Sequence, residues 1–227
     1  MKNKTLFVTL LLFSILFLSA CASNSNYNNN DSSSISNINS NASNTAIKVV
    51  IDPGHGGKDN GATGASGQYE KNFTLNVTEK VAELLKQEPQ IQVFMTRSDD
   101  SFFSQESRYR PKYANELNAD LFISIHGNTF SDSNVSGTET FYYHKNSRQF
   151  AKIIQEHVVE ATGFRDRGIK KKDLFVVKDT KMPAVLIEVG YLTNPLDEAK
   201  MWTDDFQNRV AASIVEAVKE YRDRLEK

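Results

Sequence analysis

The chain has 227 residues, of which 39% are hydrophobic and 10% aromatic, so it is long and apolar enough for one domain with a buried core. The formal net charge is −1 and becomes −3 without Lys2 and Lys4, and such a chain has no basic face strong enough for nucleic-acid binding. The single cysteine, Cys21, lies outside the expected folded part, which excludes disulfides, cysteine zinc sites and cysteine nucleophiles there.

Residues 1–20 have the pattern of an export signal. Two lysines precede an apolar stretch, Thr5–Leu18, which is too short for a membrane-spanning helix. The signal ends in Leu-Ser-Ala-Cys at Leu18–Cys21, which resembles the lipobox of bacterial lipoproteins, whose cysteine becomes the lipidated first residue. We therefore expect a protein in the cell envelope that is lipid-anchored through Cys21 to the outer face of the membrane. A general signal peptide with an incidental cysteine is the alternative.

Residues 21–45 are expected to form the lipidated cysteine and a disordered tether. Between Ala22 and Thr45, seventeen of the twenty-four residues are Asn or Ser. This composition cannot bury enough apolar surface to offset the entropy lost on ordering. As a flexible coil the tether would average roughly 27 Å from end to end. It would keep a folded domain, residues 46–227, close to the membrane.

Strand-like and helix-like patterns alternate over residues 46–227. Short segments rich in β-branched or aromatic residues predict six strands, at Ile47–Ile51, Ile91–Thr96, Leu121–His126, Thr138–Tyr143, Leu174–Lys178 and Ala184–Val189. Apolar stripes with helical spacing predict three long helices, beginning near Phe73, Phe150 and Phe206, and a shorter helix is expected at Tyr109–Leu117. This alternation predicts an α/β fold, in which a mostly parallel, twisted sheet of six strands has helices on both faces.

Four titratable residues fall at the ends of these elements, where α/β sheets bind their ligands. His55, His126 and Glu188 follow or end predicted strands, and Glu70 opens the first long helix. Polar groups at the ends of apolar strands are costly unless they have partners. Two imidazoles and a carboxylate are a frequent ligand set for catalytic zinc, and the fourth group can then act as a base. For each histidine alone, a hydrogen-bonded residue at a strand end is the alternative.

Glycines are concentrated around His55. Six of the chain's eleven glycines lie between Gly54 and Gly67. They allow a sharp turn off the strand and the close approach of a substrate backbone. A phosphate-binding loop is the alternative, but no Gly-Lys-Ser/Thr follows, and Asp59 stands where the last glycine of a GxGxxG pattern would be. The sequence therefore favours a metal site here.

Seven motifs follow one another along most of Ile47–Tyr221: IDPGHGGKDNGA, EKNFTLNV, MTRSDD, RPKYAN, FISIHGN, GTETFYY and MPAVLIEVGYLTNP. In this order they resemble the zinc-dependent N-acetylmuramoyl-L-alanine amidase family, called amidase type 3. The resemblance implies a six-stranded α/β fold and one zinc ion per chain, held by His55, Glu70 and His126. It also implies that Glu188 is catalytic. The reaction it implies is hydrolysis of the amide that joins the lactyl group of muramic acid to the first L-alanine of the peptidoglycan stem peptide.

The chain departs from the family pattern at a few positions. Gly127 stands where alanine is usual, and Val-Gly-Tyr at 189–191 replaces the commoner Leu-Gly-Phe, but neither change removes a ligand. Some family members carry an inserted helix that plugs the site until an activator protein withdraws it. Residues Tyr143–Leu174 leave room for only one helix, so we expect an open site in a monomer that needs no activator.

Several other residues are candidates for supporting roles. Asp52 is a candidate hydrogen-bond partner of a ligand imidazole, although Asp before Pro is also common where a strand ends. Arg110 and Asn128 are candidates for binding carboxylates or carbonyls of the substrate. A structural role is the alternative for each. The run Lys170–Lys172 would either attract anionic wall polymer or form a solvated turn.

Two other functions stay open from the sequence. One is a peptidoglycan-binding lipoprotein without turnover, although pure binding gives no reason for a base such as Glu188. The other is a zinc peptidase that cuts within the stem peptide, because the same four residues could perform that reaction.

Overall fold

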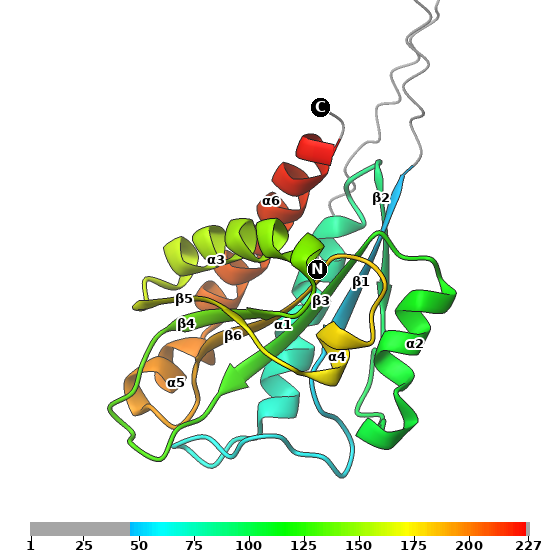
Figure 1. Cartoon of the computed structure of the whole chain (residues 1–227). Coiled ribbons are helices and arrows are strands. Elements are labelled where there is room, and N and C mark those ends of the chain that lie inside the picture. Colours follow the sequence, from blue (N-terminus) through cyan, green and yellow to red (C-terminus); the bar gives the residue numbers. More distant parts are fainter. Residues whose placement is uncertain (1–45, 226–227) are drawn as a thin grey trace, which may run out of the picture. The chain divides into compact units, whose positions relative to one another are not determined.

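The computed structural model describes residues 46–225 (Figure 1). Within them, six strands form one sheet in the order β2-β1-β3-β6-β4-β5. The strands are β1 (Ile47–Pro53), β2 (Ile91–Met95), β3 (Leu121–Asn128), β4 (Thr138–Tyr142), β5 (Asp166–Lys171) and β6 (Ala184–Tyr191). All neighbouring strands are parallel except β4 and β6, which are antiparallel. The expected α/β fold with a mostly parallel sheet is confirmed. The predictions for residues 1–20 and 21–45 lie outside the described residues.

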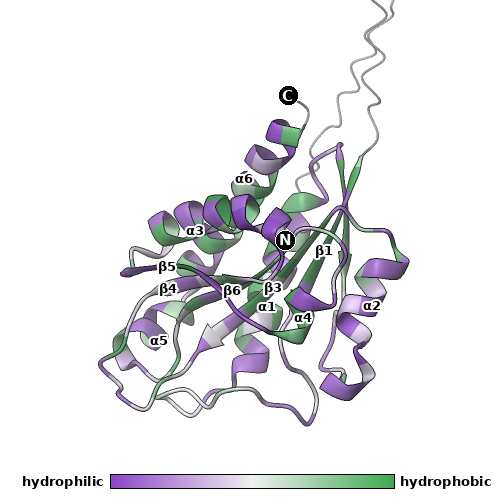
Figure 2. Cartoon of the chain, in the orientation of Figure 1, coloured by the Kyte–Doolittle hydropathy of each residue, from purple (hydrophilic) through white to green (hydrophobic). Residues whose placement is uncertain are grey.

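Helices cover both faces of this sheet. The helices α1 (Glu70–Leu85), α3 (Arg148–Thr162) and α6 (Asp204–Leu225) share one apolar cluster with Val49 and Ile51 of β1. The other cluster joins Val50 of β1 to α2 (Tyr109–Glu116) and α4 (Phe175–Lys178). Successive side chains of a strand point to opposite faces, so a run such as Val49–Ile51 is buried from both sides. Figure 2 shows the resulting concentration of hydrophobic residues along the central strands.

One predicted strand is wrong. Residues Leu174–Lys178 do not form a strand, because Phe175–Lys178 is the short helix α4, and the fifth strand is β5 at Asp166–Lys171. A short apolar run cannot distinguish a strand from one buried helical turn, and here Val176 and Val177 are buried from a helix. The strand β5 pairs only with β4 at the edge of the sheet, so its polar sequence lacks the pattern of a buried strand.

The helix α5 (Pro195–Met201) was not predicted, although its start has a clear signal. The side chain of Asn194 caps it by accepting hydrogen bonds from the backbone of Leu196 and Asp197, and Pro195 occupies the first turn. Between β4 and α3 there is one turn of 3₁₀ helix, η2 (Lys145–Ser147), and another, η1 (Gln105–Ser107), precedes α2. No helix within residues 46–225 combines the length and the apolar character needed to cross a membrane.

The buried acids of α5 connect two loops at the end of the sheet. Asp197 accepts hydrogen bonds from the Ser136 hydroxyl at 2.6 Å and the Gly137 amide at 3.2 Å. Glu198 accepts from both the amide and the hydroxyl of Ser66, at 2.8 and 2.6 Å. The loop of Ser66 precedes α1, and the loop of Ser136 and Gly137 precedes β4. The helix α5 therefore holds both loops at the same end of the sheet.

Candidate active site

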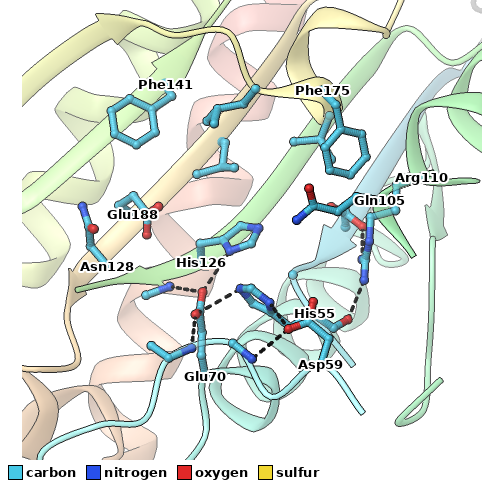
Figure 3. Close-up of a pocket in the computed structure, with 18 of the residues that line it drawn as sticks. His55, Asp59, Glu70, Gln105, Arg110, His126, Asn128, Phe141, Phe175 and Glu188 are labelled. Atoms are coloured by element: carbon cyan, nitrogen blue, oxygen red, sulfur yellow. Dashed lines mark hydrogen bonds and ion pairs between the residues drawn. The ribbon is translucent and has the colours of Figure 1, made fainter. Parts of the chain in front are cut away.

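The three central strands, β1, β3 and β6, bring the predicted site residues together towards their carboxyl ends. On the parallel strands β3 and β6, His126 lies opposite Glu188, and His55 follows the end of β1. Glu70 is the first residue of α1, where the helix dipole favours a carboxylate. All four residues line one cavity of about 780 Å³ (Figure 3).

Three of these residues form a compact set of donor atoms. The Nε2 atom of His55 lies 3.1 Å from one carboxylate oxygen of Glu70, and the Nδ1 atom of His126 lies 2.9 Å from the other. The donor atoms of the three residues all lie within 4.8 Å of one another. Ligand atoms of tetrahedral zinc are about 2.0–2.2 Å from the ion and hence about 3.3–3.6 Å apart. The set therefore fits one zinc ion after small side-chain adjustments.

The carboxylate of Glu70 is held in its charged form. Burial alone would raise its pKa, but hydrogen bonds with His126 and His55 hold that pKa well below its usual range. Its two oxygens also accept hydrogen bonds from the backbone amides of Ala62 at 2.8 Å and Gly127 at 3.1 Å. These contacts fix the carboxylate before any ion binds, as a metal ligand requires.

Asp59 supports His55, a role that no pattern in the sequence indicates. Its carboxylate lies 2.9 Å from Nδ1 of His55 and accepts a hydrogen bond from the Gly61 amide at 3.1 Å. Burial would lower the pKa of His55, but Glu70 and Asp59 together raise it. With the Nδ1 proton donated to Asp59, the Nε2 atom is left as the nitrogen that could bind a metal ion.

The hypothesis that Asp52 orients a ligand imidazole is wrong. Asp52 is fully buried, and its oxygens accept hydrogen bonds from Thr96 at 2.5 Å, Ser124 at 2.6 Å and Arg110 at 2.5 Å. Burial would raise the pKa of Asp52, but the charge of Arg110 and the hydroxyl donors lower it. This acid acts on the site indirectly, because it fixes Arg110.

Arg110 holds the turn that presents His55. It donates to the carbonyl oxygens of Pro53 at 2.7 Å and of His55 at 2.5 Å. His55 has a left-handed backbone with φ of 61°, which is uncommon for a residue with a side chain and costs on the order of 1–3 kcal/mol. The hydrogen bonds of Arg110, which is itself held by the buried Asp52, stabilise this backbone conformation and offset its cost. A substrate contact of Arg110 stays a prediction.

Two glycines of the loop make room for the side chains of His126 and Glu70. A Cβ atom on Gly54 would lie 2.6 Å from Nδ1 of His126, and one on Gly61 would lie 2.6 Å from a carboxylate oxygen of Glu70. Carbon atoms do not approach side chains this closely without displacing them. Sharp turns and the approach of a substrate are the reasons that the sequence suggests for these glycines, and the close packing of His126 and Glu70 is a further one.

Glu188 differs from His55, Glu70 and His126 because one of its oxygens has no partner. Its Oε2 atom is sealed from solvent and has no hydrogen-bond partner among residues 46–225. Burial, followed by repulsion from Glu70 and Glu139, raises the pKa of Glu188 well above the ordinary value. An unpaired buried acceptor is costly. Because the carboxyl group faces the cavity beside His126, it can take a proton from a molecule bound there (Figure 3).

Comparison with known proteins identifies the family. The family model described as N-acetylmuramoyl-L-alanine amidase matches residues 49–220. The chain belongs to this family. Among solved structures, the amidase is similar to the catalytic domain of CwlV, an N-acetylmuramoyl-L-alanine amidase from Bacillus (Paenibacillus) polymyxa. The TM-score is 0.76 and the identity 47%, over 78% of this chain and 98% of that one.

Two proteins of Bacillus subtilis are also similar to the amidase. The uncharacterised protein YqiI is 42% identical, over 78% of this chain and 85% of its own length. The N-acetylmuramoyl-L-alanine amidase LytC is 36% identical, over 76% of this chain. The match covers only 35% of LytC, so the amidase corresponds to about a third of that protein.

The remaining walls of the amidase cavity are partly apolar and partly polar. Asn128 lines the cavity, and its amide group donates to Glu139 at 2.7 Å, so its predicted substrate contact stays a prediction. Of the two interpretations of Lys170–Lys172, the solvated turn is wrong for the first two residues, which belong to β5, and the attraction of anionic wall polymer stays a prediction. The apolar wall is formed by Phe103, Phe141, Leu174, Phe175, Val176 and Leu186.

Proposed function

We propose that the amidase holds one zinc ion between His55, Glu70 and His126 and hydrolyses the lactyl–L-alanine amide of peptidoglycan. The observation that carries this proposal is the convergence of three donor atoms beside the free buried oxygen of Glu188. The names of CwlV and LytC support the substrate, since both are N-acetylmuramoyl-L-alanine amidases. A cavity of about 780 Å³ has the size of a small-molecule site and can hold a sugar–peptide junction.

A zinc ion in this ligand set supplies two effects, a lowered pKa for a coordinated water and polarisation of the amide carbonyl. Glu188 acts as the general base and accepts a proton from the attacking water. As the bond between the carbonyl carbon and the nitrogen breaks, Glu188 gives this proton to the departing nitrogen of L-alanine. Asp59 and the amides of Ala62 and Gly127 keep the ligands in place.

Removal of metal should abolish hydrolysis of the lactyl–L-alanine amide, and added zinc should restore it. The core of residues 46–225 rests on the sheet and helices rather than on the ligand residues, so the metal-free chain should stay folded. Product analysis before and after treatment with a chelator, together with circular dichroism, tests both statements. Full activity after exhaustive metal removal would contradict the proposed role of zinc.

We propose in addition that Cys21 carries a lipid anchor and that residues 21–45 tether the amidase to the outer face of the membrane. The support is the Leu-Ser-Ala-Cys motif after an apolar stretch. One acyl chain binds membranes weakly, whereas the two chains of a diacylglyceryl group give stable anchoring. The peptidoglycan partner would then lie within reach of the tether.

Cys21→Ser should move the protein from the membrane fraction to the soluble fraction, because the acyl chains can no longer be attached. The measurement is immunodetection in both fractions after a salt wash. Ser23→Ala keeps the cysteine and should stay in the membrane fraction. A Cys21→Ser protein that remains bound to membranes would refute the lipid anchor.

We further propose that the amidase works as a monomer without an activator. Between β4 and β5 the described chain contains only η2 and α3, and α3 packs in the apolar cluster with α1 and α6. This segment therefore supplies no second helix that could block the cavity. A purified, monodisperse chain that hydrolyses peptidoglycan only after another protein is added would contradict this.

A further inference from the structure

Lys172 is the one cavity-lining lysine or arginine without an acidic partner among the described residues. Three lysine or arginine residues line the cavity, namely Arg108, Arg110 and Lys172. Arg110 is buried against Asp52 at 2.5 Å, and Arg108 lies 3.6 Å from the carboxylate of Asp179. No carboxylate within residues 46–225 pairs with the ammonium group of Lys172. Its charge acts on Glu188 through space, but without an ion pair the ammonium group remains available to a bound molecule.

The fold places this ammonium group on the same wall as Glu188. Lys172 follows β5 directly, and its backbone amide donates to the carbonyl of Tyr142 at 2.9 Å. The Nζ atom lies 4.2 Å from the ring centroid of Phe141, a distance at which a cation interacts with the ring. Phe141 of β4 is paired in register with Leu186 of β6, two residues before Glu188. Figure 3 shows Phe141 and Glu188 on the same side of the cavity.

The position of Glu188 also sets the direction of the substrate, a step that rests on the proposed function. Glu188 must reach the departing nitrogen in order to return the proton. The peptide that begins at this nitrogen therefore leaves the ligand cluster on the side of Glu188, past Phe141 and Lys172. A stem peptide carries free carboxylates, at its end or on its side chains.

The interior of the cavity would repel such an acidic peptide. Five acidic residues line the cavity, of which Asp52 pairs with Arg110 and Asp173 pairs with Lys178. The other three, Asp59, Glu70 and Glu188, are neutralised only in part by imidazoles or by an ion. A cation beyond these groups would compensate the repulsion and fix the register of the peptide. We infer that Lys172 binds a free carboxylate of the peptide leaving group and is a specificity-determining residue of this amidase.

The neighbouring lysine provides a matched control. Lys171 is the last residue of β5 and directly precedes Lys172, but its Nζ atom lies 5.1 Å from the ring centroid of Tyr143, and it does not line the cavity. Lys172→Met and Lys171→Met remove the same charge and keep most of the apolar stem. A difference between the two variants therefore reports the position of the charge and not the net charge of the domain.

The experiment uses two synthetic substrates and the zinc-loaded full chain. One is an N-acetylmuramoyl dipeptide that begins with L-alanine and ends in a free carboxylate, and the other has a carboxamide in its place. For the carboxylate substrate, Lys172→Met should raise KM about tenfold with little change in kcat, and the effect should shrink at high salt. For the carboxamide substrate, and for Lys171→Met with either substrate, KM should not change.

Equal losses on both substrates, or no loss on either, would overturn the inference. A loss in kcat alone would do so as well, because it would mean that Lys172 acts through Glu188. Binding of the released dipeptide by titration calorimetry keeps this test separate from the proposed function. Even a chain that hydrolyses neither substrate should bind the carboxylate dipeptide about tenfold more tightly than Lys172→Met does, and equal binding would overturn the inference.

Discussion

Glu188→Gln should lower turnover of the lactyl–L-alanine amide by about 10²- to 10⁴-fold, the range of a general base. Glutamine has the size of glutamate but cannot take a proton from water. Zinc content and substrate binding should persist, because His55, Glu70 and His126 already supply the donor set. The measurement is kcat at saturating substrate, with zinc determined by elemental mass spectrometry.

Two results would refute this role of Glu188. A variant that loses zinc would make Glu188 a ligand, and one with near-normal turnover would make it structural. Glu156→Gln is a suitable control, because Glu156 lies exposed on α3 and, among the residues that the structure describes, pairs only with Lys152, at 3.6 Å. The same substitution there should leave kcat unchanged.

The metal-free chain gives Glu188→Gln a second, independent readout. Because burial raises the pKa of Glu188 in the folded state, the folded chain holds this proton more tightly than the unfolded chain. The contribution of Glu188 to the free energy of unfolding is present at low pH and falls as pH rises towards the folded pKa. Metal-free Glu188→Gln should therefore resist urea better than the metal-free wild type at neutral pH, and it should lose this part of the pH dependence.

Gly54→Ala should weaken zinc binding and turnover by about 100-fold, although it removes no ligand. The added Cβ would lie 2.6 Å from Nδ1 of His126 and closer still to Cε1, so the imidazole must move. A displacement of about 1 Å at a catalytic site can cost about 10²-fold in rate. Zinc affinity measured by competition with a chelator, together with kcat/KM, tests this expectation.

Gly168→Ala serves as the control for Gly54→Ala. Gly168 lies on β5 with φ of 75°, and a Cβ there would meet no atom within 4 Å. That variant should lose some stability through backbone strain but should keep its zinc affinity. A Gly54→Ala protein with normal zinc affinity and turnover would mean that His126 can move without consequence, contrary to the proposed site.

Much of the fold could be predicted because its central strands are apolar on both sides. Runs such as Val49–Ile51 indicate buried parallel strands whatever surrounds them. The edge of the sheet was harder to predict, because β5 is largely polar and α4 is an apolar run of only four residues. Periodicity carries little information in segments of this length.

The site shows the same division. His55, Glu70, His126 and Glu188 could be singled out, because each is a polar residue beside an apolar run. His55 follows β1, Glu70 opens α1, and His126 and Glu188 lie in the second halves of β3 and β6. The contacts that hold these four residues in place could not be predicted, because they join segments that are far apart in the chain. The pair of Asp52 and Arg110 spans 58 residues, and the steric need for a glycine at position 54 arises only when β3 places His126 beside it.

The most direct test of the proposed function is mass spectrometry of purified peptidoglycan after incubation with the zinc-loaded chain. We expect free stem peptides that begin with L-alanine, together with glycan chains whose muramic acid lactyl groups end in a free carboxylate. Glu188→Gln, incubated in parallel, should release almost none of these peptides. Stem peptides shortened at an internal bond would instead indicate a peptidase, and unchanged peptidoglycan would indicate a binding protein; either result would contradict the proposed amidase reaction.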